Sequence, residues 1–219
     1  MRNKLIFGIA LFILFSTFIS QNKFTINKFK IKEIKIENNE IIKDQELINI
    51  FSFLYSKDII FLNSHELKKK LKQNSFIEKI EIKRVFPNKL VIKVFEKKPI
   101  AILIDKNKKK FYLGKKIDLI EYRKILKYNK LPIVEGEQKS FKILFNNLIK
   151  INFPTEQVLR YRHFKFHRWD IEMVDKKILK LPKKNYTESL INFMSIQEKA
   201  NFEKYKIFDY RLKDQLILK

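Results

Sequence analysis

An uncharged stretch near the N-terminus constrains this chain more than any other feature. Eighteen residues without a charge run from Leu5 to Asn22, and their apolar part reads LIFGIALFILFSTFI. At 1.5 Å per helical residue this stretch spans about 27 Å, close to a bilayer core of about 30 Å. A cleaved signal peptide is the alternative, but Phe18 to Gln21 lack an A-x-A-like pattern of small residues. The pattern therefore favours an uncleaved transmembrane anchor over residues 5–22.

The charges that flank this stretch bear on its orientation. Arg2 and Lys4 precede it, which favours a cytoplasmic N-terminus, although Lys23, Lys28 and Lys30 on the other side reduce the asymmetry. The tail of residues 1–4 is too short to hold a domain. The sequence thus predicts a single-pass protein whose bulk lies outside the cytoplasm.

Composition limits the functions that the rest of the chain can have. Lys and Arg number 48 against 24 Asp and Glu, but the lysines are spread along the whole chain rather than clustered as in a nucleic-acid binder. Cysteine is absent, and the three glycines lie far apart, so a thiol site and a phosphate-binding glycine loop are both excluded. No assembled set of acid, base and nucleophile is visible. We expect no catalytic, cofactor or metal site and no nucleic-acid partner.

Residues 23–98 read as a compact module of order β-α-α-β-β. A strand around residues 31–36 is followed by an amphipathic helix with Asp44 as its N-cap, and by a second helix with Ser64 as its N-cap. Two alternating strands then flank a turn at residues 86–88. The fold class expected for the whole chain is therefore α+β, with this module next to the anchor.

Residues 99–219 predict a mostly antiparallel β domain that contains two helices. The expected helices are an amphipathic one over residues 141–149 and another that opens with a capping box of Asn185 and Glu188. The expected strands are residues 100–104, 110–113, 116–120, 131–134, 158–166, 169–174, 178–181 and, at the C-terminus, 207–218.

Several residues allow both a functional and a structural interpretation. His163 and His167 lie four residues apart but without a third ligand, so surface positions are favoured over a metal site. Trp169 alternates with apolar residues, which favours a core position over an interface. The run Lys106 to Lys110 could bind anionic lipid or polymer, and a solvated hairpin tip is the simpler interpretation.

Ordered motifs give the chain a family resemblance. They are Ile34 to Asn39, Phe76-Ile77 with Arg84 to Leu90, Glu96 to Ala101, Leu131 to Gly136, Arg168-Trp169-Asp170, Leu179 to Pro182 and Asp209-Tyr210-Arg211. In this order the chain resembles the FtsQ/DivIB family of bacterial cell division proteins. The resemblance implies a POTRA module followed by a β domain, both in the periplasm, on a protein of the inner membrane at the division septum.

The resemblance also implies partners. In this family the last strand of the β domain offers its edge to a strand of FtsB, in a complex that includes FtsL and controls septal cell-wall synthesis. The resemblance places the partner contacts of this chain on Arg168, Tyr210, Leu212, Asp214 and Leu216. From the residues alone, Leu212 and Leu216 are equally compatible with a buried core position.

Two other function classes remain open from the sequence. One is an exported basic binder of anionic polymer or nucleic acid, which the net charge of +24 favours. The other is a POTRA-containing membrane-assembly factor, which would need repeated modules or a barrel that the sequence does not show.

Overall fold

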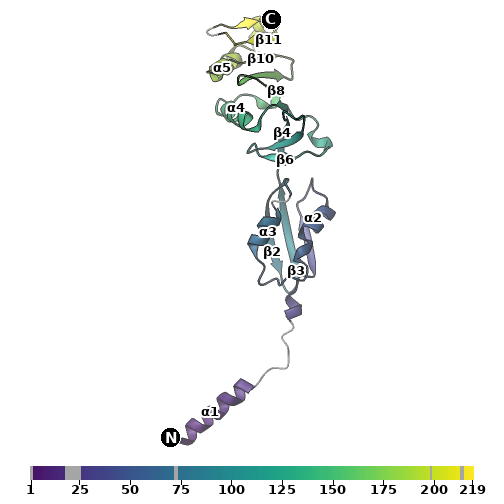
Figure 1. The fold of residues 1–219 in the computed structure, drawn as a ribbon, viewed down its shortest axis with the longest axis vertical. Helices are drawn as coiled ribbons and strands as arrows, with labels where there is room; N and C mark the ends of the chain where they lie inside the picture. Colours follow the sequence, from purple (N-terminus) through teal and green to yellow (C-terminus); the bar gives the residue numbers. More distant parts are fainter. Residues whose placement is uncertain (1, 18–25, 72–73, 198, 213–214) are drawn as a thin grey trace. The chain divides into compact units, whose positions relative to one another are not determined.

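The described residues form an α+β protein, which confirms the α+β part of the predicted fold class (Figure 1). The computed structural model describes residues 2–17, 26–71, 74–197, 199–212 and 215–219. Contacts within the chain divide it into two units, Met1–Lys72 with Lys79–Phe95 and Gln73–Glu78 with Glu96–Lys219. The sequence predicts different limits: a tail of residues 1–4, an anchor of 5–22, a module of 23–98 and a β domain of 99–219. These domain limits remain a prediction.

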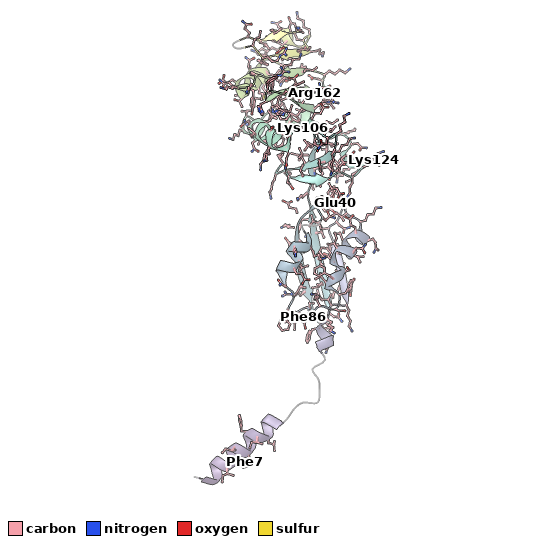
Figure 2. All side chains as sticks on the ribbon, in the orientation of Figure 1. Phe7, Glu40, Phe86, Lys106, Lys124 and Arg162 are labelled. Atoms are coloured by element: carbon pink, nitrogen blue, oxygen red, sulfur yellow. The ribbon has the colours of Figure 1, made fainter. Side chains whose placement is uncertain are left out.

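The N-terminal apolar stretch forms helix α1 (Arg2–Thr17), on which Phe7, labelled in Figure 2, is exposed. Phe12 is exposed as well. Within the described residues, no helix combines the length and the apolar character that crossing a bilayer requires. The last five residues of the predicted anchor, 18–22, lie outside the described residues.

The first unit has the predicted order of elements. They are β1 (Glu33–Glu37), α2 (Asp44–Phe51), α3 (Ser64–Leu71), β2 (Ile77–Val85) and β3 (Lys89–Glu96), with short 3-10 turns at η1 (Ile26–Phe29) and η2 (Ser52–Leu54). The three strands form one sheet in the order β1-β3-β2, in which β1 runs parallel to β3. The β-α-α-β-β prediction is confirmed.

The core of the first unit follows from its apolar periodicity. Leu47 and Phe51, one helical turn apart on α2, are fully buried, and so are the alternate residues Leu90 and Ile92 of β3. Burying such a side chain contributes about 1.5–3 kcal/mol. Both N-cap predictions were wrong by one position, because α2 begins at Asp44 itself and α3 at Ser64 itself.

The second unit contains one large mixed sheet. Its strands are β4 (Pro99–Ile104), β5 (Lys110–Gly114), β6 (Leu119–Glu121), β7 (Ile133–Glu135), β8 (Val158–Phe164), β9 (Arg168–Met173), β10 (Ile178–Lys180), β11 (Ile207–Asp209) and β12 (Ile217–Leu218). In the described part of the chain their order is β12-β11-β10-β9-β8-β7-β4-β5-β6. Five neighbouring pairs are antiparallel and three are parallel.

Helices α4 (Gln138–Lys150) and α5 (Tyr186–Ile196) cover one face of this sheet, and η3 (Leu126–Tyr128), η4 (Thr155–Gln157) and η5 (Ala200–Phe202) are short turns. Phe141 of α4 and Phe193 of α5 share one core with the alternate strand residues Tyr161, Ile171 and Phe208. The intervening strand residues therefore project from the opposite, open face of the sheet.

Two local predictions in the second unit were wrong. The strand expected at residues 116–120 begins only at Leu119, because Gly114 to Asp118 form a turn in which the Ile117 amide donates to the Gly114 carbonyl. At α5, Asn185 adopts a left-handed φ of 56°, and its carbonyl accepts the Glu188 amide. Its side chain makes no capping hydrogen bond, so the expected capping box does not form.

Candidate partner-binding surface

The C-terminal segment contains two short strands rather than the single predicted strand over residues 207–218. The Tyr210 amide still donates to the Lys180 carbonyl at 2.9 Å. The Asp209 carboxylate then accepts the Arg211 amide at 3.1 Å and the Arg211 guanidinium at 2.7 Å. Such a local side-chain bond competes with the strand ladder, so the chain leaves the sheet here and returns as β12.

Strand β12 forms the edge of the sheet beside β11. The register pairs Phe208 with Leu218, and Ile207 and Lys219 exchange two backbone bonds of 2.9 and 3.1 Å. Because antiparallel pairs alternate between bonded and non-bonded, the Leu218 amide and carbonyl point away from β11. An edge strand of this kind presents backbone groups with which another strand can pair.

A hollow of about 680 Å³ lies between the start of α5 and the segment that leads into β12. It is lined by residues 182–185, 188, 189, 192, 210–212, 215 and 216. Two of the lining residues are joined, because the Tyr210 hydroxyl donates to Asn192 Oδ1 at 2.9 Å. The hollow therefore adjoins the open edge and combines apolar, amide and cationic groups.

The structure brings together three of the five residues that the family resemblance places in the partner site. Tyr210, Leu212 and Leu216 line this hollow. Leu212 is 53% exposed, Leu216 is half-buried against the core, and Tyr210 is buried. Asp214 lies outside the described residues. Arg168 lines a different hollow, on the open face of the sheet.

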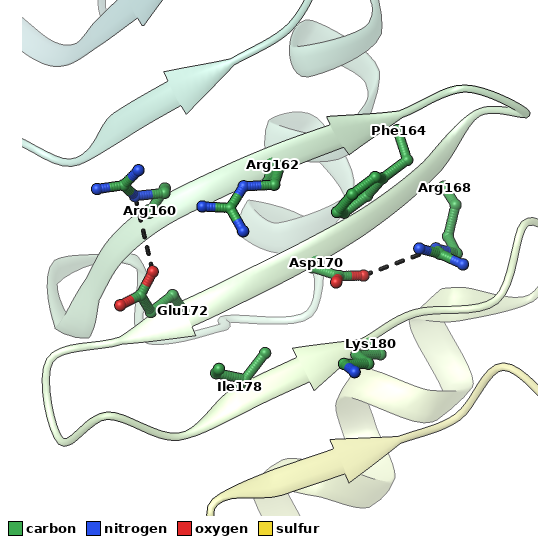
Figure 3. A pocket seen from close by; sticks show the side chains of 8 residues that line it. All are labelled: Arg160, Arg162, Phe164, Arg168, Asp170, Glu172, Ile178 and Lys180. Atoms are coloured by element: carbon green, nitrogen blue, oxygen red, sulfur yellow. Dashed lines mark ion pairs between the residues drawn. The ribbon is translucent and has the colours of Figure 1, made fainter.

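That second hollow, of about 360 Å³, is built by the outward residues of β8, β9 and β10 (Figure 3). Its lining residues are Arg160, Arg162, Phe164, Arg168, Asp170, Glu172, Ile178 and Lys180. Figure 3 marks ion pairs from Arg160 to Glu172 at 3.6 Å and from Arg168 to Asp170 at 3.7 Å. Four cations and two carboxylates give this lining a net positive charge.

Sequence reasoning missed the role of Glu135 and Asp170 beside this hollow. The Glu135 carboxylate accepts Arg160 at 2.6 Å and Arg162 at 2.8 Å, and these cations lower its pKa against the opposing effect of burial. Burial raises the pKa of Asp170, whose Oδ1 is buried without a hydrogen-bond partner among the described residues. Arg160 and Arg162 alternate along β8, but no local pattern in the sequence identifies the acids that lie opposite them.

The histidine and tryptophan predictions had different outcomes. Trp169 is 5% exposed and packs within the core, which confirms the core interpretation. His167 is exposed as expected, whereas His163 is half-buried because its ring stacks on Trp169 at 4.5 Å. In the part of the chain that the structure describes, no three His, Asp or Glu side chains converge as metal ligands.

Comparison with known proteins agrees with this architecture. Residues 29–97 match the family model of the FtsQ-type POTRA domain, so the first unit defines a POTRA-domain protein. The chain is 27% identical to the cell division protein FtsQ of Rickettsia bellii and 26% identical to that of Rickettsia conorii; both matches cover 85% of this chain and 71% of the relative. It is 30% identical to the cell division protein DivIB of Clostridium tetani, over 51% of this chain and 42% of the relative. The chain therefore contains an FtsQ-type POTRA domain and is similar over most of its length to proteins of the FtsQ/DivIB family, as its sequence motifs predict.

Proposed function

We propose that this chain works in bacterial cell division as a membrane-anchored scaffold that binds a partner strand along β12. The observation that carries this proposal is the outward-facing backbone of Leu218 at the end of the sheet. An incoming strand gains affinity from main-chain hydrogen bonds to such an edge, and specificity from alternate side chains.

The side chains around the edge suit this mode of binding. Ile217 is 38% exposed and Leu212 is 53% exposed, so both offer apolar area to an incoming chain. Arg211, next to Leu212 in the chain, donates two hydrogen bonds of 2.7 and 2.5 Å to the Asp209 carboxylate. A partner that combines an extended strand with apolar side chains fits this surface best, as the family resemblance suggests for an FtsB-like protein acting with an FtsL-like one.

The anchor and topology belong to the same proposal. Helix α1 exposes Phe7, Phe12 and Leu14 to solvent, which is costly in water and favourable in lipid. With Arg2 and Lys4 on the cytoplasmic side, the two units lie in the periplasm at the septum, where the scaffold helps to control septal cell-wall synthesis. It carries out no chemistry of its own.

A pull-down tests the edge most directly. The full chain is presented to FtsB-like and FtsL-like proteins beside a Leu218→Pro variant and a Leu218→Ala control. Proline at position 218 removes an outward-facing donor and leaves the Ile207–Lys219 bonds to β11 available. We expect the alanine variant to retain the partner and the proline variant to lose at least tenfold in affinity, because backbone pairing is interrupted.

Two results would contradict the proposal. Equal capture by both Leu218 variants would place the partner away from β12. Absence of capture at every salt concentration, together with salt-sensitive binding of an anionic polymer, would favour the basic-binder class instead.

A further inference from the structure

One end of the first unit exposes large apolar side chains. Phe61 is 81% exposed, Phe86 is 59% exposed and Ile60 is 45% exposed. Single exposed apolar residues are common, but contiguous ones mark surfaces that contact a protein or a membrane. Ile60, Phe61 and Phe86 form such a contact surface if they lie together.

Phe86 lies in the turn between β2 and β3, at the end of the unit beside η1 (Figure 2). Its ring packs edge-on against Phe29, with the centroids 6.4 Å apart. The Phe29 carbonyl in turn accepts the Ile59 amide at 3.0 Å. Figure 2 shows Phe86 at one end of the first unit and Glu40 at the opposite end.

A second contact holds the chain on the other side of Phe61. The Arg84 guanidinium donates to the Leu62 carbonyl at 3.5 Å. Since Ile59 is bonded to Phe29 and Leu62 to Arg84, the intervening Ile60 and Phe61 are held at the same end as Phe86. We call Phe29, Ile60, Phe61 and Phe86 the aromatic tip.

Cations surround the aromatic tip. Backbone position places Lys28, Lys30, Lys32, Lys57 and Arg84 here; for example, the Lys32 amide donates to the Asn88 carbonyl at 2.8 Å. The neighbouring carboxylates are Asp58, Glu33, which pairs with Lys89 at 2.5 Å, and Glu66, which pairs with Lys57 at 3.4 Å. The tip therefore combines aromatic side chains with an excess of positive charge.

The length of chain between α1 and η1 limits how far this end of the first unit can lie from α1. Nine peptide steps join Thr17 at the end of α1 to Ile26 at the start of η1. At about 3.3–3.6 Å per residue, they span at most roughly 30 Å. If α1 is held in a bilayer, as the proposed function requires, the end of the unit that bears η1 stays near the lipid surface.

We propose that the aromatic tip docks on the anionic lipid surface of the membrane that holds α1. Phe61 and Phe86 enter the boundary between headgroups and acyl chains, and the surrounding lysines pair with lipid phosphates. This inference rests on the anchor part of the proposed function and does not involve the β12 edge.

Site-specific fluorescence on the full chain tests the docking. The sequence contains no cysteine, so Asn63→Cys, at an exposed position two residues from Phe61, carries a single nitrobenzoxadiazole label. The labelled chain is reconstituted into vesicles of phosphatidylcholine with phosphatidylglycerol and a doxyl-labelled lipid. We expect quenching at this position, and none at a Leu126→Cys label, which is 81% exposed in the second unit.

Matched variants separate the two parts of the tip. Phe61→Ser in the labelled chain should abolish most of the quenching. Lys28→Gln with Lys32→Gln should lower the contact equilibrium roughly thirtyfold, because each cation near an anionic surface contributes about fivefold. The control pair Lys108→Gln and Lys109→Gln, on an exposed hairpin of the second unit, should change nothing.

The outcomes distinguish the tip from the anchor. A chain washed from the vesicles by alkaline carbonate shows that the anchor proposal fails. A chain that is retained, but whose Asn63→Cys label is not quenched, overturns the tip proposal alone. Shielding of that label only on addition of an acidic protein would assign the tip to a protein partner and would also overturn it.

Discussion

The two edges of the large sheet differ in whether a side chain accepts their outward backbone amide. At the β6 edge the Gly114 amide donates to the Asp118 carbonyl at 3.0 Å, and alternation along the pair turns the Glu121 amide outward. Ser75 Oγ accepts that amide at 2.9 Å. At the β12 edge the Leu218 amide is turned outward in the same way, and among the described residues no strand follows it in the sheet.

This difference indicates which of the two edges can pair with a strand of another protein. Proteins cover exposed edges because unpaired strands recruit other chains. A sheet that satisfies its β6 edge with a side chain from residues 73–78, yet ends at β12 with outward backbone groups, favours β12 as the binding edge. Its two-residue length limits uncontrolled pairing, since a short edge offers few bonds.

The largest expected effect comes from removing the support of β12. Phe208 is fully buried on β11 and packs edge-on against Phe193 at 5.0 Å. Phe208→Ala should lower the free energy of unfolding by about 3–5 kcal/mol and weaken partner capture along with it. Urea unfolding measures this, with the 83% exposed Phe166→Ala as control, expected to change by less than about 0.5 kcal/mol. A small effect at Phe208 would mean that β11 and β12 do not depend on this core.

A smaller effect is expected where the chain turns away from the edge. Asp209→Asn removes the charge that pairs with Arg211, and charged hydrogen bonds of this kind contribute about 1.5–3 kcal/mol. The Arg211 guanidinium lowers the pKa of Asp209 below its ordinary value of 3.8. The stabilisation is thus fully present above about pH 4 and is lost as the pH falls through the lower folded-state pKa.

Unfolding of the wild type and Asp209→Asn at several pH values checks this. Their difference should shrink steadily below pH 4, whereas the exposed Glu203→Gln control should show no comparable change. A difference that stays constant down to acid pH would show that the ion pair does not stabilise the turn.

The smallest effect concerns the covered edge. Ser75→Ala removes the acceptor of the Glu121 amide and should cost about 0.5–1.5 kcal/mol, since water can replace this exposed bond. Ser195→Ala, whose hydroxyl bonds only one turn back to the Asn192 carbonyl, is the matched control. Partner capture through β12 should be unchanged. Loss of capture in Ser75→Ala would place the binding edge at β6 and reverse the comparison.

Local periodicity predicted the elements whose burial is set by their own sequence. The helix expected over residues 141–149 is α4, because Phe141, Leu144 and Leu148 recur on one face and all three are buried. The alternation in β3 likewise predicted Leu90 and Ile92 as core residues. In these segments the spacing of apolar residues alone determines which face is buried.

The candidate site depended on interactions that spacing does not encode. Apolar alternation suggested one strand over residues 207–218, but the Asp209–Arg211 bonds turn the chain after Asp209. The hollow around Arg168 arises from the register of β8, β9 and β10, which joins residues far apart in sequence. Hydrogen bonds between a side chain and the backbone, and registers between distant strands, are not visible in local patterns.

The position of β12 in the sequence also determines when its edge of the sheet forms during synthesis. β12 follows every other strand of its sheet along the chain. A ribosome delivers residues from the N-terminus at roughly 5 to 20 per second, so the binding edge comes into existence after the rest of the sheet has been synthesised. If β12 is the edge that binds the partner, as proposed, products truncated before residue 218 lack the binding surface even when the other strands of the sheet are present.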